Sequence, residues 1–272
     1  VCSSDLAIAQ IPGDKIFFVQ MADAPLLAMD VLEWSRHFRC FPGQGEFDLA
    51  GFLAPILRSG YTGPLSLEIF NDGFRAAPPR ANAADGLRSL LYLEEKTRKL
   101  LEKDAEPINT DILFNPPPAS SYNGVEFLEF AVDEAQGARL STWLENLGFA
   151  RLGQHRSKAV SLLRQGDIKI VLNAEPYSFA HSFFEAHGPS LCAMALRVDD
   201  GSAALERAQM YKGQPYRGLV GPNEREIPSV RAPDGSLIYL VEPADPGKSI
   251  YDSDFKVEDR KSTRLNSSHN HD

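Results

Sequence analysis

The sequence predicts an α/β part followed by an α+β part, and three observations support this division. Apolar runs typical of strands alternate with helical patterns over residues 15–103, as in parallel β/α units. Residues 106–121, EPINTDILFNPPPASS, contain four prolines and predict a linker, because proline interrupts helices and central strands. Over residues 122–258 a strand, a helix and shorter strands follow one another, and this order occurs twice. A repeated βαβββ unit predicts a curved mixed sheet.

The first part is expected to contain two strands and two helices. The run at residues 15–23, KIFFVQMAD, is nearly continuously apolar, which is typical of a strand buried on both faces. A loop follows, and then Asp48 is in place to cap a helix with apolar positions at helical spacing. The second strand is LSLEIF at residues 65–70, and Asn82 is in place to cap a long helix that extends to about Lys103.

The second part is expected to contain strands around two helices. A hairpin turn at residues 165–167 joins two short strands, and the core stripe of the first helix includes Trp143 and Leu144. The segment FAHSFFEAHG, residues 179–188, is expected to be a loop. The predicted strands cover residues 125–132, 149–156, 159–164, 168–172, 191–198, 227–231 and 237–241, and the predicted helices cover residues 134–147 and 201–211.

Composition limits the classes of protein that are compatible with this sequence. Lys and Arg number 28 against 37 Asp and Glu, so the formal charge is -9 and a nucleic-acid partner is not expected. With 43% hydrophobic and 24% charged residues, the chain is typical of a globular protein. No run approaches the about 20 apolar residues of a spanning helix, and no secretory signal is evident, so we expect no membrane partner and a cytoplasmic location. Cys2, Cys40 and Cys192 are widely spaced, which favours buried or idle thiols over a disulfide or zinc site.

Both ends differ from the rest of the chain. Residues 1–6, VCSSDL, and residues 259–269, DRKSTRLNSSH, resemble translations of sequencing-adapter DNA. Ordinary flexible termini are the alternative. We expect residues 1–6 and 259–272 to be artefacts of this kind, and the chain to be an internal fragment of a protein that continues beyond both of them.

Two polar side chains are candidates for a metal site in the first part. Alternation along residues 65–70 places Glu68 opposite the leucines of that strand, and Gln20 holds a similar position in the strand before it. Their oxygens, at the C-terminal ends of neighbouring parallel strands, suit a hard ion such as Mg²⁺ or Mn²⁺. A carboxylate in a buried strand otherwise needs a basic partner or a proton. A buried arginine for Glu68 and a backbone carbonyl for Gln20 are therefore the alternatives.

Three motifs in the first part resemble the xylose-isomerase-like TIM-barrel family: VQMADAP at residues 19–25, SRHFRCFPGQGEFDL at 35–49 and GYTGPLSLEIFND at 60–72. The resemblance covers about residues 11–93 and implies the last part of a (β/α)8 barrel. It also implies that Gln20 and Glu68 are metal ligands and that Arg39 binds a substrate carboxylate. His37 stands near this site in the sequence and is the candidate catalytic residue, with a solvated loop histidine as the alternative.

Within this family the resemblance is strongest to the bacterial 3-dehydroshikimate dehydratases, since Gln20 stands where sugar isomerases often have His. The implied reaction is loss of water from 3-dehydroshikimate to give protocatechuate, with Mg²⁺, Mn²⁺ or Co²⁺ as cofactor. A sugar-phosphate isomerase or epimerase of the same barrel family is the alternative. The remaining metal ligands and the general base are expected on earlier strands, so the chain by itself is expected to have little or no activity.

The second part resembles the vicinal-oxygen-chelate superfamily over residues 125–242. Its continuation YLVEPADPGKSIYDSDF, residues 239–255, resembles the N-terminal module of 4-hydroxyphenylpyruvate dioxygenase. In active modules of this superfamily a histidine on the first strand and a glutamate on the last bind iron. The matching positions here hold Phe127 and Tyr239, so no iron is expected in residues 122–258.

Other interpretations remain open for the second part. His155, His181 and His187 are the histidines available for an iron site, but two of them lie in one expected loop and no carboxylate stands at the expected strand end. A non-catalytic module that binds a ligand or dimerises is a further alternative. The expected partners are a small-molecule substrate and, in a homo-oligomer, a second copy of the chain.

Overall fold

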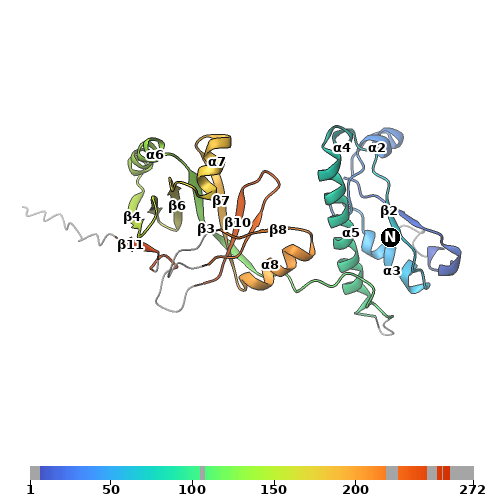
Figure 1. Ribbon diagram of the computed structural model, residues 1–272. Coiled ribbons are helices and arrows are strands. Elements are labelled where there is room, and N and C mark those ends of the chain that lie inside the picture. The colour runs from blue at the N-terminus through green and yellow to red at the C-terminus, as the bar shows by residue number, and fades with distance from the viewer. Residues whose placement is uncertain (1–6, 105–107, 219–225, 244–249, 253, 258–272) are drawn as a thin grey trace, which may run out of the picture. The chain divides into compact units, whose positions relative to one another are not determined.

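A computed structural model describes residues 7–104, 108–218, 226–243, 250–252 and 254–257 (Figure 1). The chain divides into unit 1, Val1–Pro116, and unit 2, Pro117–Asp272, and each unit is described by itself. The division falls within the stretch predicted as a linker, residues 106–121. Both ends predicted to be adapter-derived lie outside the described residues, as does Cys2.

Unit 1 is built on a pair of parallel strands, β1 (Val19–Met21) and β2 (Leu65–Leu67), whose register pairs Gln20 with Ser66. The helices are α2 (Val31–His37), α3 (Leu49–Arg58), α4 (Asp72–Ala76) and α5 (Pro79–Leu101), with a short 3-10 helix η1 (Gly13–Lys15) before β1. Apolar side chains of the strands, α3 and α5 share one core, whose buried members are Val19, Met21, Leu53, Ile56, Tyr61 and Leu93.

The helix cap at Asp48 is confirmed, and the cap at Asn82 is wrong. The Asp48 carboxylate accepts a hydrogen bond from the Gly51 N–H at 2.9 Å at the start of α3. Helix α5 begins instead at Pro79, a residue that suits the first turn because no backbone N–H is required there. The Asn82 side chain lies inside this helix and donates to the Phe74 carbonyl.

The first predicted strand is longer than the observed one. Of residues 15–23, only Val19–Met21 form β1, and Phe17 is 86% exposed. Two short helices, α2 and α4, lie where the sequence patterns indicate loops. Both are capped by side chains, because Asp30 accepts from the Leu32 N–H at 2.9 Å and Asn71 accepts from the Phe74 N–H at 3.2 Å.

In the described residues of unit 2, nine strands form a mixed sheet in the order β11-β4-β5-β6-β3-β7-β10-β9-β8 (Figure 1). Strands β3 and β6 are parallel, β7 and β10 are parallel, and the two halves meet at the antiparallel pair β3–β7. The βαβββ order and the mixed sheet predicted from the sequence are thus confirmed. The strands are β3 (Tyr122–Ala131), β4 (Ala150–His155), β5 (Val160–Gln165), β6 (Ile168–Asn173), β7 (Ser190–Val198), β8 (Gln214–Tyr216), β9 (Ser229–Arg231), β10 (Leu237–Val241) and β11 (Phe255–Val257).

Helices pack on this sheet through alternate residues of its strands. Leu163 and Leu172 share a cluster with Leu144 of α6 (Glu134–Asn146), whereas their neighbours Leu162 and Val171 belong to a separate cluster. Helix α8 (Gly201–Met210) packs its Ala204 against Val198 and Leu240, while α7 (Phe179–His187) packs its Ala180 against Ala131, Cys192 and Leu237. Each half of the repeat therefore contributes one helix in the expected place, and α7 is additional.

Three predictions for unit 2 are wrong. Residues 179–188 are not a loop, because Phe179–His187 form α7, capped by the Ser178 hydroxyl, which accepts from the His181 N–H at 3.1 Å. Strands β8 and β11 are absent from the predicted set. Trp143 lies outside the core, since it is 60% exposed. In the described part of the chain, no helix is long and apolar enough to cross a membrane.

Candidate metal and substrate site

Gln20 and Glu68 lie on the same face of the β1–β2 pair. Gln20 stands between the buried Val19 and Met21 and is paired with Ser66, so its side chain leaves the sheet away from the core. The Glu68 N–H donates to the Met21 carbonyl at 3.3 Å, which continues the parallel ladder past the end of β2. Alternation then places Glu68 on the side of Ser66, and therefore of Gln20.

The guanidinium group of Arg39 contacts Glu68 directly. Its Nη1 donates to Oε2 of Glu68 at 2.9 Å and to the Glu68 carbonyl at 3.2 Å. Its Nε donates to the Ser35 carbonyl at 2.8 Å, and its central carbon lies 4.7 Å from the centre of the Phe70 ring. An arginine partner is the alternative to a metal ion for Glu68, and this partner is Arg39. The family resemblance assigns the same arginine to the substrate.

Glu68 is open to solvent in this chain. Its side chain is 45% exposed, whereas that of Arg39 is 27% exposed. The expectation of a carboxylate in a buried strand is therefore wrong for Glu68 as the structure describes it. An ion pair with this exposure is screened by water and contributes at most about 1 kcal/mol to stability.

Backbone hydrogen bonds place Arg39 beside the end of β2. Phe38 forms a bridge with Asn71, and the Arg39 N–H donates to the Phe70 carbonyl at 3.1 Å. The Asn71 side chain donates from Nδ2 to the Arg39 carbonyl at 2.9 Å. These contacts fix both peptide groups of Arg39, so the position of its side chain follows from the docking of residues 38–40 along residues 70–71.

Asp23 is a site residue that the sequence analysis did not single out. It is 1% exposed, and its carboxylate accepts from the N–H groups of Gly43 at 2.9 Å and Phe47 at 3.1 Å. A Cβ on Gly45 would lie 2.3 Å from Oδ1 of Asp23, so the loop can approach the carboxylate only with glycine at this position. The turn Pro42-Gly43-Gln44-Gly45 is therefore wrapped around a buried acid, and an acidic residue ending an apolar strand was the available signal.

Cys40 is paired with the same aspartate. The Cys40 N–H donates to the Asp23 carbonyl at 2.8 Å, and the Asp23 N–H donates to the Cys40 carbonyl at 3.0 Å. Burial, and then the nearby charge of Asp23, raise the pKa of the Cys40 thiol to about 11. The thiol is thus neutral near pH 7, which is consistent with a packing role.

His37 is the last residue of α2, and Asp72 orients it. Its Nδ1 lies 2.8 Å from Oδ2 of Asp72, and the two side chains are 45% and 64% exposed. The solvated histidine given as the alternative therefore agrees with its exposure. The contact with Asp72 nevertheless fixes the orientation of the His37 ring, whereas a surface histidine without a partner would rotate freely.

The oxygen atoms of Gln20 and Glu68 are of the chemical type that binds a divalent cation, but two residues are too few to complete its coordination. Amide and carboxylate oxygens are ligands that Mg²⁺ and Mn²⁺ accept, and they lie on one face of the sheet. Within the described ranges, no group of three or more His, Cys, Asp or Glu side chains is placed to hold a metal ion. Because Mg²⁺ takes about six ligands, these two residues form at most part of its coordination sphere.

Phe127 and Tyr239, at the positions where iron ligands were expected in active modules, lie next to each other in unit 2. Their ring centroids are 5.9 Å apart, and Phe127 also contacts the ring of Tyr251 at 6.4 Å. Phe255 belongs to the same cluster. Aromatic packing thus occupies the place that resemblance to the superfamily assigns to metal ligands.

A buried acid, Glu129, lies on the same strand as Phe127. It is 7% exposed and accepts a hydrogen bond from Nδ2 of Asn173 at 2.6 Å. Burial raises the pKa of this carboxyl, although the Asn173 hydrogen bond opposes the shift. The pKa of Tyr239 is raised well above its usual value, by burial first and then by the charge of Glu129. Glu129 is absent from the residues predicted for a site, although an acid in the apolar run of a predicted central strand was an available signal.

The three histidines of unit 2 do not form a metal site in the part that the structure describes. His155 lies on β4 with its ring centroid 5.3 Å from that of Phe255. His181 and His187 lie on α7, where Nε2 of His181 is 3.4 Å from Oε1 of Glu185. The alternative of a histidine triad therefore has no support in the geometry.

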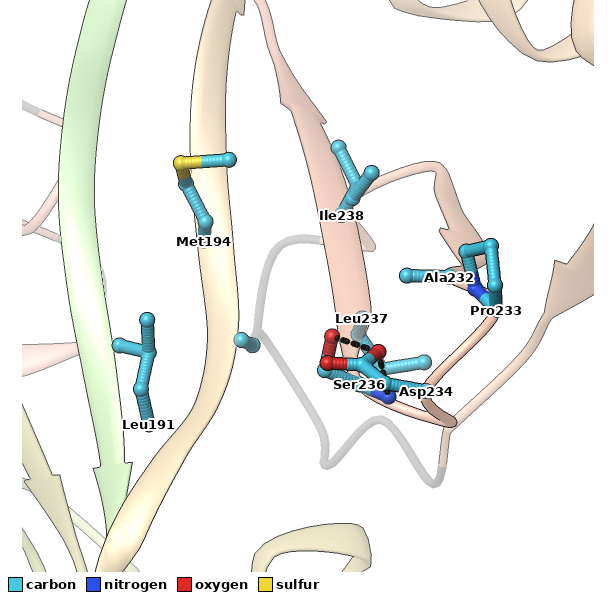
Figure 2. Close-up of a pocket in the computed structure, with 9 residues that line it drawn as sticks. Leu191, Met194, Ala232, Pro233, Asp234, Ser236, Leu237 and Ile238 are labelled. Carbon is cyan, nitrogen blue, oxygen red and sulfur yellow. Dashed lines mark hydrogen bonds between the residues drawn. The ribbon is translucent and has the colours of Figure 1, made fainter. Parts of the chain in front are cut away.

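A cavity of about 300 Å³ lies at the start of β7 and β10, and Figure 2 shows the residues that line it. Its lining is apolar apart from Asp234 and Ser236, and these two bond to each other, because both the hydroxyl and the N–H of Ser236 donate to Oδ1 of Asp234 at 2.6 and 3.0 Å. This cavity therefore offers no convergent polar groups for catalysis. The apolar lining comprises Leu191, Ala193, Met194, Ala232, Pro233, Leu237 and Ile238.

The two parts of the chain match two different protein families. Residues 3–93 match the family described as xylose isomerase-like TIM barrel. Residues 115–256, about half of the chain, match the family described as hydroxyphenylpyruvate dioxygenase, HPPD, N-terminal, and the chain belongs to that family. The fold class predicted from the sequence is thereby confirmed for both parts.

Relatives match almost the whole chain. The 3-dehydroshikimate dehydratase of Pseudomonas putida is 75% identical over 252 residues, which are 93% of this chain and 40% of the relative. The protein of the same name from Pseudomonas aeruginosa is 74% identical over 258 residues, which are 95% of this chain and 41% of the relative. The chain thus spans about two fifths of the length of these curated relatives.

A solved structure shows the same combination of parts. It is described as a xylose isomerase-like TIM barrel/4-hydroxyphenylpyruvate dioxygenase fusion protein, is 74% identical, and superposes with a TM-score of 0.85. The match covers 94% of this chain and 41% of that chain. Over unit 2 alone, a 4-hydroxyphenylpyruvate dioxygenase of a Pseudomonas species is 42% identical over 132 residues, 48% of this chain and 36% of the relative. The resemblance stated for each part of the sequence is confirmed.

Proposed function

We propose that this chain is part of a divalent-metal-dependent 3-dehydroshikimate dehydratase, a lyase that converts 3-dehydroshikimate to protocatechuate and water. The observation that carries the proposal is the identity of 75% to the Pseudomonas putida dehydratase over 93% of this chain. The site geometry supports it, because Arg39 contacts the Glu68 carboxylate just past the end of β2, and the strand register places Gln20 on the same face of the sheet.

Gln20 and Glu68 are the proposed metal ligands in this chain. Mg²⁺, Mn²⁺ or Co²⁺ would supply a positive charge that stabilises the oxygen of the substrate ketone as the neighbouring proton leaves. The remaining ligands and the general base are proposed to lie in parts of the barrel that the relatives contain and this chain does not, which is consistent with its span of 40% of the relative.

Arg39 is proposed to bind the carboxylate of the substrate. Its guanidinium already holds one acid, Oε2 of Glu68, at 2.9 Å, and its Nε is fixed on the Ser35 carbonyl. A guanidinium fork has several donors, so the same group can hold a substrate carboxylate while the backbone contacts keep its position. A cation bound at Glu68 would neutralise its carboxylate, and the guanidinium of Arg39 would then be available to the substrate carboxylate.

His37 is the proposed residue for proton exchange near the site. Asp72 fixes the ring through Nδ1, so Nε2 is the atom placed to give up or take a proton. In the dehydration, a C–H bond next to the ketone and the C–O bond of a ring hydroxyl break, and the proton and hydroxide leave as water. A proton delivered from Nε2 to the departing hydroxyl would assist this step.

The experiment uses the complete protein with Mn²⁺ or Mg²⁺ and follows protocatechuate by its ultraviolet absorbance. Glu68→Gln should lower turnover about 100-fold, since a ligand loses its charge. Glu33→Gln, at an exposed position on α2, is the matched control and should leave turnover unchanged. Absence of protocatechuate together with conversion of sugar phosphates would instead support an isomerase or epimerase.

For unit 2 we propose a module that functions without bound iron. The support is the aromatic cluster in which Phe127 and Tyr239 lie 5.9 Å apart. Titration of Fe²⁺ into the chain under reducing, oxygen-free conditions should show no saturable one-to-one binding. Stoichiometric binding that is lost on substitution of His155 would refute this proposal.

A further inference from the structure

A second cavity of unit 2 lies between α7 and the segments that follow β8 and β9. Its volume is about 540 Å³, within the roughly 300–1,000 Å³ range of small-molecule sites. It does not share lining residues with the cavity of Figure 2. The lining comprises Tyr177, Ser178, Phe179, Ser182, Phe183, Ala186, His187, Tyr216, Arg217, Gly218, Arg231 and Gly235.

The charge of this lining is opposite to that of the chain. The chain carries a formal charge of -9, yet the described residues that line the cavity include Arg217, Arg231 and His187 and no aspartate or glutamate. Cationic groups that converge on a concave surface raise the local concentration of anions. The lining therefore selects for a negatively charged ligand.

Arg231 is held in place by aromatic rings. The central carbon of its guanidinium lies 5.4 Å from the ring centre of Phe179 and 5.1 Å from that of Tyr216, and these two rings are 5.3 Å apart. Its Nη1 donates to the Gly235 carbonyl at 3.3 Å. Contacts with two rings orient the planar group and restrict its rotation, which lowers the entropy that is lost when an anion binds.

No carboxylate in the described part of the chain forms an ion pair with Arg231. The nearby Asp234 is occupied by Ser236, whose hydroxyl and N–H both donate to its Oδ1. These hydrogen bonds are the main reason that the pKa of Asp234 is lowered, and the charge of His187 contributes least. Among the described residues, the positive charge of Arg231 is thus not paired with a carboxylate.

The rest of the lining provides ring surfaces for an apolar group. The ring centroids of Phe183 and His187 are 4.3 Å apart with their planes tilted by 36°, and the ring centroid of Phe179 lies 5.7 Å from that of Phe183. Tyr177 is 94% exposed at the edge of the cavity and has a φ of 59°, a left-handed conformation that is unfavourable for a side chain of this size. Backbone strain of this kind is concentrated at binding and catalytic sites.

We propose that this cavity binds a small organic oxyanion that carries a planar ring. The oxyanion, a carboxylate or a phosphate, contacts Arg231 and Arg217, and the ring packs against Phe183 and His187. This site is separate from the proposed metal site, since all of its residues belong to unit 2. It therefore does not depend on the dehydratase proposal.

Isothermal titration calorimetry on the full 272-residue chain tests this proposal with four probes. Benzoate and phenyl phosphate combine a ring with an anion, whereas acetate and inorganic phosphate carry the charge alone. We expect saturable binding of at least one ring-bearing anion, at least about tenfold tighter than its counterpart without a ring, because ring burial adds apolar contact. The stronger of benzoate and phenyl phosphate identifies carboxylate or phosphate as the preferred group.

Variants locate the site. Arg231→Gln should weaken binding about tenfold or more, since a charge-assisted hydrogen bond is lost, while Arg231→Lys should retain part of the affinity. Arg139→Gln, on the exposed surface of α6, is the matched control and should bind like the parent chain. Circular dichroism verifies the fold of each variant, and Arg217→Gln provides a second test if Arg231→Gln misfolds. The proposal is overturned if neither benzoate nor phenyl phosphate binds more tightly than its counterpart without a ring, or if Arg139→Gln weakens binding as much as Arg231→Gln.

Discussion

Arg39 and Glu68, the residues assigned to substrate and metal, bind each other at 2.9 Å in this chain. Each therefore satisfies the charge of the other when neither ligand is bound. A cation bound at Glu68 and a substrate carboxylate bound at Arg39 would replace this ion pair with two new ones, one at each residue. The pair thus links the two proposed binding events, because each requires that the Arg39–Glu68 contact be weakened.

The first prediction separates the stability role of Glu68 from its function. Glu68→Gln should lower the free energy of unfolding of the chain by less than about 1 kcal/mol, because the ion pair is half exposed and screened. Urea denaturation followed by circular dichroism measures this change. In the complete protein the same variant should bind Mn²⁺ about 100-fold more weakly. A variant that unfolds would assign Glu68 a structural role instead.

Asp23 should behave in the opposite way. Asp23→Ala removes the acceptor of three backbone N–H groups, those of Ala24, Gly43 and Phe47, in a site that is 1% exposed. Buried donors without acceptors are costly, so the variant should lose about 2–4 kcal/mol in urea denaturation. The control is Asp14→Ala, whose side chain is 72% exposed, and it should change the free energy by less than about 0.5 kcal/mol. Equal losses in both variants would contradict this account.

Local signals in the sequence predicted the parts of the site that depend on one segment. Alternation along residues 65–70 placed Glu68 on a polar face, and Asp48 marked the start of α3. The sequence allows an arginine as the partner of Glu68 but does not identify Arg39 as that arginine. The contact depends on the docking of residues 38–40 against residues 70–71. Such contacts between distant segments leave no periodic pattern in the sequence.

Two errors in unit 2 have different physical origins. Helix α7 carried signals that were present in the sequence, a serine cap at Ser178 and a glycine at Gly188 after its last turn. The exposure of Trp143 could not be predicted in the same way, because helical spacing identifies a stripe but not which of two neighbouring positions packs on the sheet. Here Leu144 is buried and Trp143 is exposed.

The third prediction concerns pH. Burial raises the pKa of Glu129 above its unfolded value, so the folded chain binds more protons than the unfolded chain between those two pKa values. Stability should therefore fall as pH rises from about 4.5 through the raised pKa. Glu129→Gln keeps an oxygen acceptor for Asn173 and removes the buried charge, so at pH 7 it should be about 1–2 kcal/mol more stable than the parent chain. Denaturation at a series of pH values should show this advantage shrinking as pH falls, and a constant difference would contradict the explanation.

The last prediction concerns a buried ion pair that fixes the C-terminal part of unit 2. Oε1 of Glu126 accepts from Nζ of Lys169 at 2.6 Å and from the Tyr251 hydroxyl at 3.0 Å, and the side chains of Glu126 and Lys169 are 10% and 16% exposed. Lys169→Met would leave the carboxylate with Arg197, whose Nη1 lies 3.6 Å from Oε2 on a side chain that is 40% exposed, so it should lose about 1–3 kcal/mol of stability in urea denaturation.

The double variant Glu126→Gln/Lys169→Met distinguishes the loss of attraction from the cost of a buried charge that Arg197 alone compensates. If this charge is the main cost, the double variant should recover at least about 1 kcal/mol relative to Lys169→Met, because the buried carboxylate is then neutral. Lys256→Met, at an exposed position on β11, is the matched control for the loss of a lysine. If the double variant is as unstable as Lys169→Met, removal of the buried charge does not raise the free energy of unfolding. The loss of stability would then come from the missing hydrogen bond between Lys169 and Glu126 and not from the charge.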